Sequence, residues 1–203
     1  KEVVPTALAL AEWFVSSGGA PRGRGRMAAH LGDSATLPKN LCGDAPPGRN
    51  APLPLPGLYP QGVMIGVAFG QLTAPALGFL GARASGLRLT PWRMILAEGM
   101  HEMPACDGLI AQAEHPILRV IACSGAPRCR EAHADTRALA IALAPSLPAD
   151  ANLHISGCAK ACARSGPASV TLIATREGFD LVRGGSTRDE PVLRGLSYDT
   201  ILS

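Results

Sequence analysis

Four of the six cysteines form two short pairs, and this pattern restricts the possible folds of the chain more than any other feature of the sequence. Cys123 and Cys129 lie in CSGAPRC, and Cys158 and Cys162 lie in GCAKAC. Each pair directly follows an apolar run with the composition of a strand, ILRVIAC and ANLHISGC. We therefore expect both pairs to leave a sheet at the same edge, which would place four thiols at one site.

Spacing helps to choose among the chemistries open to four cysteines. A C-x5-C gap is wide for structural zinc, which favours gaps of about two to four residues. A four-iron cluster needs one thiolate per iron and suits wider loops. Cys158 and Cys162 are four residues apart, so on a helical turn both thiols would point from one face. Structural zinc, two disulfides and buried reduced cysteines remain alternatives, and Cys42 and Cys106 have no partner at a useful spacing.

Several longer runs extend this pattern. LRLTPWRMIL, GLI, CSGAP, SGCAKAC with GPA, GFDLVRGG and PVLRGLS occur in this order from about position 63 to the end. In that order they resemble the precorrin-3B synthase family, a branch of the nitrite/sulfite reductase superfamily. The resemblance implies that Cys123, Cys129, Cys158 and Cys162 bind a 4Fe-4S cluster. It also implies an α+β fold, in which a ferredoxin-like half-domain precedes a nitrite/sulfite reductase-type cluster-binding domain.

The resemblance also implies an activity, within aerobic cobalamin biosynthesis. Such enzymes use oxygen and a reductant to hydroxylate precorrin-3A and close a lactone, with electrons relayed by the cluster and oxygen activated by a mononuclear iron. No ligands for that iron and no particular electron donor can be picked from this sequence.

Two alternatives remain. A sirohaem-dependent sulfite or nitrite reductase would use Cys162 to bridge the cluster and the sirohaem iron, although LTPWR and GFDLVRGG favour the cobalamin enzyme. A non-catalytic cluster-binding remnant or electron-transfer module is the other, because the family's N-terminal half has no counterpart here. A companion protein would then supply that half.

Basic residues near the motifs are candidates for substrate binding. Arg88 and Arg93 bracket LTPW, and arginine is well shaped to bind the carboxylates of a precorrin. Lys160 and Arg164 flank the second cysteine pair, where their positive charge would offset the negative charge of a thiolate-bound cluster. Surface exposure is the alternative for all four. Arg137, in ADTRALA, is a weaker candidate, which we interpret as a surface residue.

The chain departs from the family pattern beside the second pair. Glycine, histidine and proline are expected where Ala161, Arg164 and Ser165 stand. The extra methyl group of Ala161 is tolerable unless the backbone there needs a positive φ. His154 lies four residues before Cys158, from where it could approach a cluster or substrate, but we interpret it as a packed or solvated strand residue.

Composition shifts divide the chain into four segments. We predict a helical and irregular leader at 1–44, a proline-rich linker at 45–60, the ferredoxin-like half-domain at 61–112 and the cluster-binding domain at 113–203. The predicted helices span 73–84, beginning at a Thr73 cap, and 131–143, ending before Pro145. The predicted strands span 63–69, 87–90, 93–97, 118–122, 152–155, 169–174 and 179–182.

Charge and hydropathy exclude two classes of partner. A net charge of +3 over 203 residues, with no run of lysine or arginine, is too weak to indicate nucleic-acid binding. No apolar stretch approaches the roughly 20 residues of a membrane span, and Glu2 and Glu12 interrupt the apolar start that would otherwise suggest a signal peptide. A cytoplasmic location is therefore expected, and an iron-sulfur cluster would need its reducing conditions.

Overall fold

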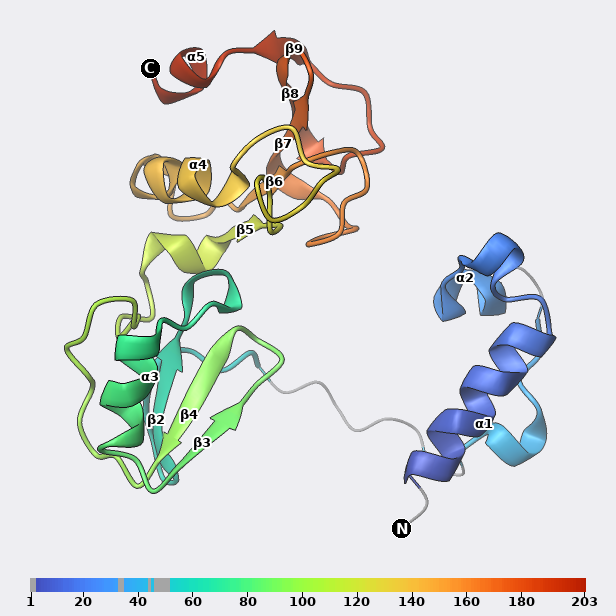
Figure 1. Ribbon diagram of the computed structural model, residues 1–203, viewed down its shortest axis with the longest axis horizontal. Helices are drawn as coiled ribbons and strands as arrows, with labels where there is room; N and C mark the ends of the chain where they lie inside the picture. Colours follow the sequence, from blue (N-terminus) through green and yellow to red (C-terminus); the bar gives the residue numbers. More distant parts are fainter. Residues whose placement is uncertain (1–2, 33–34, 44, 46–51) are drawn as a thin grey trace. The chain divides into compact units, whose positions relative to one another are not determined.

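The chain forms two compact units, Lys1–Pro52 and Leu53–Ser203. The computed structural model describes residues 3–32, 35–43, 45 and 52–203 (Figure 1). Part of the predicted linker, 46–51, lies outside these residues, and the division into four segments stays a prediction.

The first unit is helical. It contains α1 (Val3–Ser16), α2 (Met27–Gly32) and two short 3-10 turns, η1 (Pro21–Gly23) and η2 (Lys39–Leu41). His30 of α2 lies with its ring centroid 5.5 Å from those of Trp13 and Phe14 on α1. Its Nε2 atom is 2.8 Å from the Ser17 hydroxyl. The helix predicted in the leader is therefore present, and aromatic contacts hold it against the second one.

The second unit begins with a four-stranded antiparallel sheet in the order β1-β2-β4-β3. Its strands are β1 (Gly57–Tyr59), β2 (Gly62–Gly66), β3 (Gly86–Leu89) and β4 (Met94–Glu98). Since β2 and β3 both pair antiparallel with β4, they run parallel to each other, and α3 (Ala74–Gly81) connects them. This split β-α-β arrangement is that of a ferredoxin-like half-domain, as predicted. Figure 1 shows α3 lying along the sheet.

Local sequence signals explain α3. The Thr73 hydroxyl accepts a hydrogen bond from the Ala76 amide at 3.3 Å, so the predicted cap is confirmed. Leu80 then packs against Val63 and Ile65 of β2, and all three side chains are fully buried. Burial of each such side chain contributes on the order of 2 kcal/mol to stability.

A five-stranded mixed sheet in the order β5-β6-β7-β8-β9 forms the rest of the unit. Its strands are β5 (Val120–Ala122), β6 (Leu153–Ser156), β7 (Ala168–Thr175), β8 (Gly178–Gly185) and β9 (Leu193–Leu196). The first three strands are parallel and the last three are antiparallel. Helix α4 (Thr136–Leu143) connects β5 to β6, and α5 (Tyr198–Leu202) ends the chain. The α+β fold class is thus confirmed.

Alternation along the strands gives this sheet two different faces. Ile155 and Leu172 pack with Leu139 of α4 in the main core. Successive strand residues point to opposite faces, so His154 and Thr171, which are paired in register, lie on the other face. Both of these polar residues are fully buried. The η4 turn (Pro116–Arg119) leads into β5, and a bridge between Gly66 and Ile110 joins the chain before it to the first sheet.

Two expectations about the elements need correction. The helix predicted from 131 is wrong at its start, because α4 begins at Thr136 behind an Asp135 cap. The residues before it form a loop instead, in which the His133 amide donates to the Gly157 carbonyl at 2.9 Å. Strands β1 and β9 and helix α5 were not predicted. Over the ranges that the structure describes, none of the helices combines the length and apolarity needed to cross a membrane.

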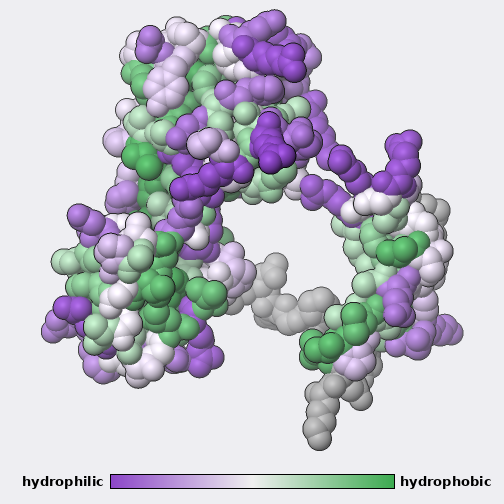
Figure 2. Space-filling view, in the orientation of Figure 1, coloured by the Kyte–Doolittle hydropathy of each residue, from purple (hydrophilic) through white to green (hydrophobic). Residues whose placement is uncertain are grey.

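The surface of the second unit is more apolar over one sheet than over the other (Figure 2). Figure 2 shows extended apolar surface on the body that holds the four-stranded sheet, and many hydrophilic side chains over the five-stranded sheet. Exposed apolar side chains in the first of these regions include Leu58, Leu77, Leu89 and Trp92.

Candidate functional site

The two cysteine loops begin at the same edge of the five-stranded sheet. Strands β5 and β6 are parallel neighbours, and Ala122 pairs with Ile155 at their carboxyl ends. Cys123 directly follows β5, and its amide donates to the Ile155 carbonyl at 3.3 Å. Cys158 lies three residues after Ile155, two residues beyond the end of β6 at Ser156. The predicted shared edge is confirmed.

Backbone contacts tie the two loops together. The Gly157 amide donates to the Cys123 sulfur at 3.2 Å, and the Gly157 carbonyl accepts from the His133 amide. A Cβ atom at position 157 would lie 2.7 Å from the Ala132 side chain, so the close approach of the loops needs glycine there. Lys160 in the second loop also pairs with Glu131 in the first at 3.1 Å. This pair is exposed, so the backbone contacts matter more to the arrangement.

The four thiols have the donor chemistry that a cluster requires. All six cysteines are free, which leaves no disulfide between the pairs. Cys123, Cys129 and Cys158 are half-buried, and Cys162 is exposed. An amide that donates to a cysteine sulfur, as Gly157 does, is a feature that tunes cluster potentials.

The four thiols lie at one edge of the sheet, but they do not converge on a common metal position. Among the described residues, no three histidine, cysteine, aspartate or glutamate side chains lie close enough to hold one metal ion. The residue types and their common edge fit a four-thiolate site, and the ligand assignment itself stays a prediction.

Ala161 has a backbone conformation that glycine adopts more easily. Its φ is 54°, in the left-handed region, and its side chain is buried. This conformation costs a residue with a Cβ atom roughly 1 kcal/mol. The backbone at position 161 thus has the positive φ at which alanine is less favourable than the glycine expected from the resemblance.

The candidate arginines make separate contacts. Arg88 is 71% exposed and pairs with Glu98 at 2.7 Å on the neighbouring strand. Arg93 instead lines a cavity of about 330 Å³ beside Trp92, and its Nη1 donates to the Val120 carbonyl at 3.1 Å. Burial lowers the pKa of Arg93 below its ordinary value. Arg93 thus lines a cavity and Arg88 is engaged in an ion pair, and a role in substrate binding stays a prediction for both.

The two basic residues of the second cysteine loop are engaged locally. Lys160 makes the ion pair with Glu131, and the Arg164 Nε donates to the Pro167 carbonyl at 2.8 Å. Lys160 is exposed and Arg164 is half-buried.

Arg137 has a more specific place than the sequence indicated. Its Nε donates to the Cys123 carbonyl at 3.2 Å, and the hydroxyl of the buried Thr136 donates to the same oxygen at 2.9 Å. The first turn of α4 therefore holds the first cysteine loop. A capped helix start directly behind a cysteine motif was the signal in the sequence that could have shown this contact.

His154 is a buried titratable group beneath the site. It is fully buried, and neither ring nitrogen has a hydrogen-bond partner in the described part of the chain. Burial, with a smaller contribution from the Arg164 charge, lowers the pKa of His154 to about 4. The imidazole is thus neutral at physiological pH, and of the packed and solvated alternatives for His154 the structure shows the packed one.

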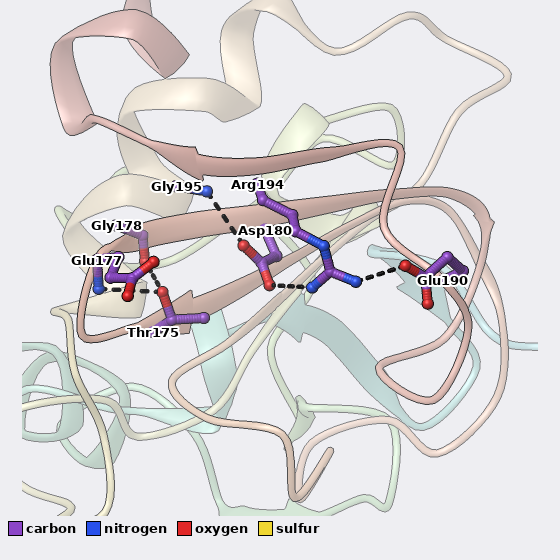
Figure 3. A network of polar contacts seen from close by, with 7 residues as sticks. All are labelled: Thr175, Glu177, Gly178, Asp180, Glu190, Arg194 and Gly195. Carbon is purple, nitrogen blue, oxygen red and sulfur yellow. Dashed lines mark hydrogen bonds and ion pairs between the residues drawn. The ribbon is translucent and has the colours of Figure 1, made fainter.

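A second cavity, of about 430 Å³, lies beside Cys158. Asp180 and Arg194 line it and form an ion pair at 3.3 Å, and Arg194 also pairs with Glu190 (Figure 3). Asp180 further accepts a hydrogen bond from the Gly195 amide at 3.1 Å. This network joins β8 to β9 and satisfies the charges on that wall of the cavity.

Comparison with known proteins gives a relative that covers most of the chain. No model of a known protein family matches it. A precorrin-3B synthase from a Sinorhizobium species is 27% identical over an alignment of 213 positions. The alignment covers 93% of this chain and 45% of that protein. The chain thus spans less than half the length of this curated relative.

Among solved structures, the NirA protein of Mycobacterium tuberculosis is 19% identical and matches with a TM-score of 0.48, over 75% of this chain and 38% of that one. The resemblance to precorrin-3B synthase that the cysteine motifs indicate extends along nearly the whole of this chain.

Proposed function

We propose that this chain binds a 4Fe-4S cluster through Cys123, Cys129, Cys158 and Cys162 and forms part of an oxidoreductase that acts on a tetrapyrrole. The observation that carries this proposal is the common edge of the two cysteine loops, which backbone hydrogen bonds tie together. The name and the coverage of the precorrin-3B synthase relative support the tetrapyrrole substrate, here precorrin-3A.

The residues of the chain would each have a defined part. The Gly157 amide orients the Cys123 sulfur, and Arg137 and Thr136 fix the carbonyl of the same residue. The cluster, when bound, supplies one-electron transfer. Arg93, which lines a largely apolar cavity with Trp92, would bind a carboxylate at the edge of a flat ring.

The share of the relative that this chain spans limits the activity that can be proposed for the chain alone. It spans 45% of its relative, so an electron-transfer module that works with a companion half-protein is a second candidate. The electron donor and any mononuclear iron would be supplied with the complete enzyme. The six free cysteines fit a reducing compartment, and we propose the cytoplasm.

Metal content tests the proposal most directly. Anaerobically purified protein should contain iron and acid-labile sulfide in equal amounts. Stoichiometric zinc without sulfide would contradict the cluster assignment. Sirohaem bands in the optical spectrum would instead assign the chain to the sulfite and nitrite reductases.

Single substitutions test the ligands. Cys129→Ser should remove the broad absorption near roughly 400 nm that such clusters show, whereas Cys42→Ser, in the first unit, should retain it. Equal loss in both variants would reject the ligand set. Lactone formation from precorrin-3A, oxygen and reductant by the isolated chain would exclude the electron-transfer module.

A further inference from the structure

The loop after β2 separates two cavities of the second unit. Ala68 and Phe69 line both the cavity that holds Arg93 and a larger one of about 490 Å³. Phe69 has a φ of 54°, which is rare for a bulky side chain and costs free energy that the surrounding structure must offset. This backbone conformation places the Phe69 ring between the two cavities that the residue lines.

The larger cavity carries two guanidinium groups. Arg128, from the first cysteine loop, donates through Nη1 to the Gln71 side chain at 2.9 Å. Arg137, from α4, uses Nε on the Cys123 carbonyl, and its guanidinium carbon lies 5.8 Å from the centre of the Phe69 ring. Burial and the like charge of Arg128 lower the pKa of Arg137, which agrees with two cations close together.

Asp135 attracts the charge of Arg137 without forming an ion pair with either arginine. Within the described ranges, neither Arg128 nor Arg137 takes part in an ion pair. Asp135 is the acidic residue in the cavity lining, and its carboxylate already accepts hydrogen bonds from the Arg137 and Ala138 amides, both at 3.1 Å. The Nη groups of Arg137 therefore keep donors free on the cavity side of α4.

The other walls are apolar. Phe69, Pro127, Ala138 and Ile141 line the cavity, and Ile141 is 59% exposed. A ligand that fits these walls combines a flat apolar body with a carboxylate, because a guanidinium pairs with a carboxylate through two parallel hydrogen bonds. Several carboxylates around one ring would let a single ligand reach Arg93 as well, on the other side of Phe69.

We propose that Arg128 and Arg137, with the Phe69 ring, form a carboxylate-binding site for one edge of a tetrapyrrole, directly beside the first cysteine loop. This inference rests on the proposed function for the identity of the ligand, and it names the residues that bind it. Arg128 was not a candidate in the sequence, and Arg137 was a weaker one that we interpreted as a surface residue.

Equilibrium dialysis with a porphyrin that bears four carboxylates tests the site without requiring turnover. Arg128→Gln should weaken binding by roughly tenfold or more, as expected for loss of a charged hydrogen-bond donor, and Arg128→Lys should recover part of it. Arg83→Gln is the matched control, since it removes one positive charge from an exposed arginine, just after α3, that bonds the Phe79 carbonyl of that helix. A cationic porphyrin of the same size should bind more weakly than the anionic one.

Arg137→Gln should also weaken binding, with the far-ultraviolet circular dichroism spectrum showing whether the variant folds. Unchanged binding by Arg128→Gln, equal losses in Arg128→Gln and Arg83→Gln, or no binding of the anionic porphyrin by the unaltered chain would each overturn the inference. Iron and sulfide measured on the same samples separate the two proposals. A cluster without arginine-dependent binding defeats this inference alone, and arginine-dependent binding without a cluster defeats the cluster assignment alone.

Discussion

Acidification should destabilise the second unit through the buried His154. Its folded pKa is about 4, against 6.5 for an ordinary histidine. Above pH 6.5 the imidazole is neutral in both states, so it adds no pH dependence. As the pH falls from 6.5 to 4, the unfolded chain takes up a proton that the folded chain excludes. Linkage then lowers the free energy of unfolding by about 2 kcal/mol near pH 5 and about 3 kcal/mol near pH 4.

Urea unfolding of the wild type and of His154→Leu, repeated across this pH range, measures the effect. Leucine keeps an apolar side chain in the buried position and cannot titrate. The free energy of unfolding of the variant should therefore rise relative to the wild type by about 2 kcal/mol between roughly pH 7.5 and roughly pH 5. Other titrating groups cancel in this difference because both proteins contain them.

Thr171→Val serves as the control, since Thr171 is buried opposite His154 on the next strand and does not titrate. It should lose stability by a similar amount at every pH. The opposite result is a difference in the free energy of unfolding between the wild type and His154→Leu that stays constant within about 0.5 kcal/mol across this pH range. That result would refute the reasoning, because the imidazole would then reach solvent in the folded state.

Three further substitutions test the cysteine loops. Ala161→Gly should raise the free energy of unfolding by roughly 0.5 kcal/mol, since relief of the positive φ outweighs the lost methyl group; a lower melting temperature would contradict this. Thr136→Val should cost about 1–2 kcal/mol in urea unfolding, because the Cys123 carbonyl loses a buried hydrogen bond, and no loss would show that water replaces it. Lys160→Gln should change stability by less than about 0.5 kcal/mol, because its pair with Glu131 is exposed, and a double-mutant cycle giving more would contradict that assessment.

Local sequence signals predicted most of the elements. The Thr73 cap and the apolar runs located α3 and the central strands, since capping and alternation act over a few residues. The split β-α-β topology followed from their order and from the family resemblance. The start of α4 was misplaced because helix propensity continues upstream of Asp135, while hydrogen bonds to Gly157, which is distant in sequence, hold the preceding residues in a loop.

Edge elements were missed for a different reason. Strand β1 lies in a proline-rich stretch, and β9 is short and mostly exposed. Neither has the apolar alternation of a buried strand, and each exists because it pairs with a longer neighbour.

The four cysteines, their spacing and the strands before them were set by the sequence, and parallel pairing made their common edge foreseeable. Which cations surround that edge was decided by the tertiary structure alone. Arg88 and Arg137 have the same charge, yet one pairs with Glu98 on an exposed strand and the other bonds the Cys123 carbonyl. The physical reason is that burial and pairing of a charge depend on side chains far away along the chain, and no local pattern records them.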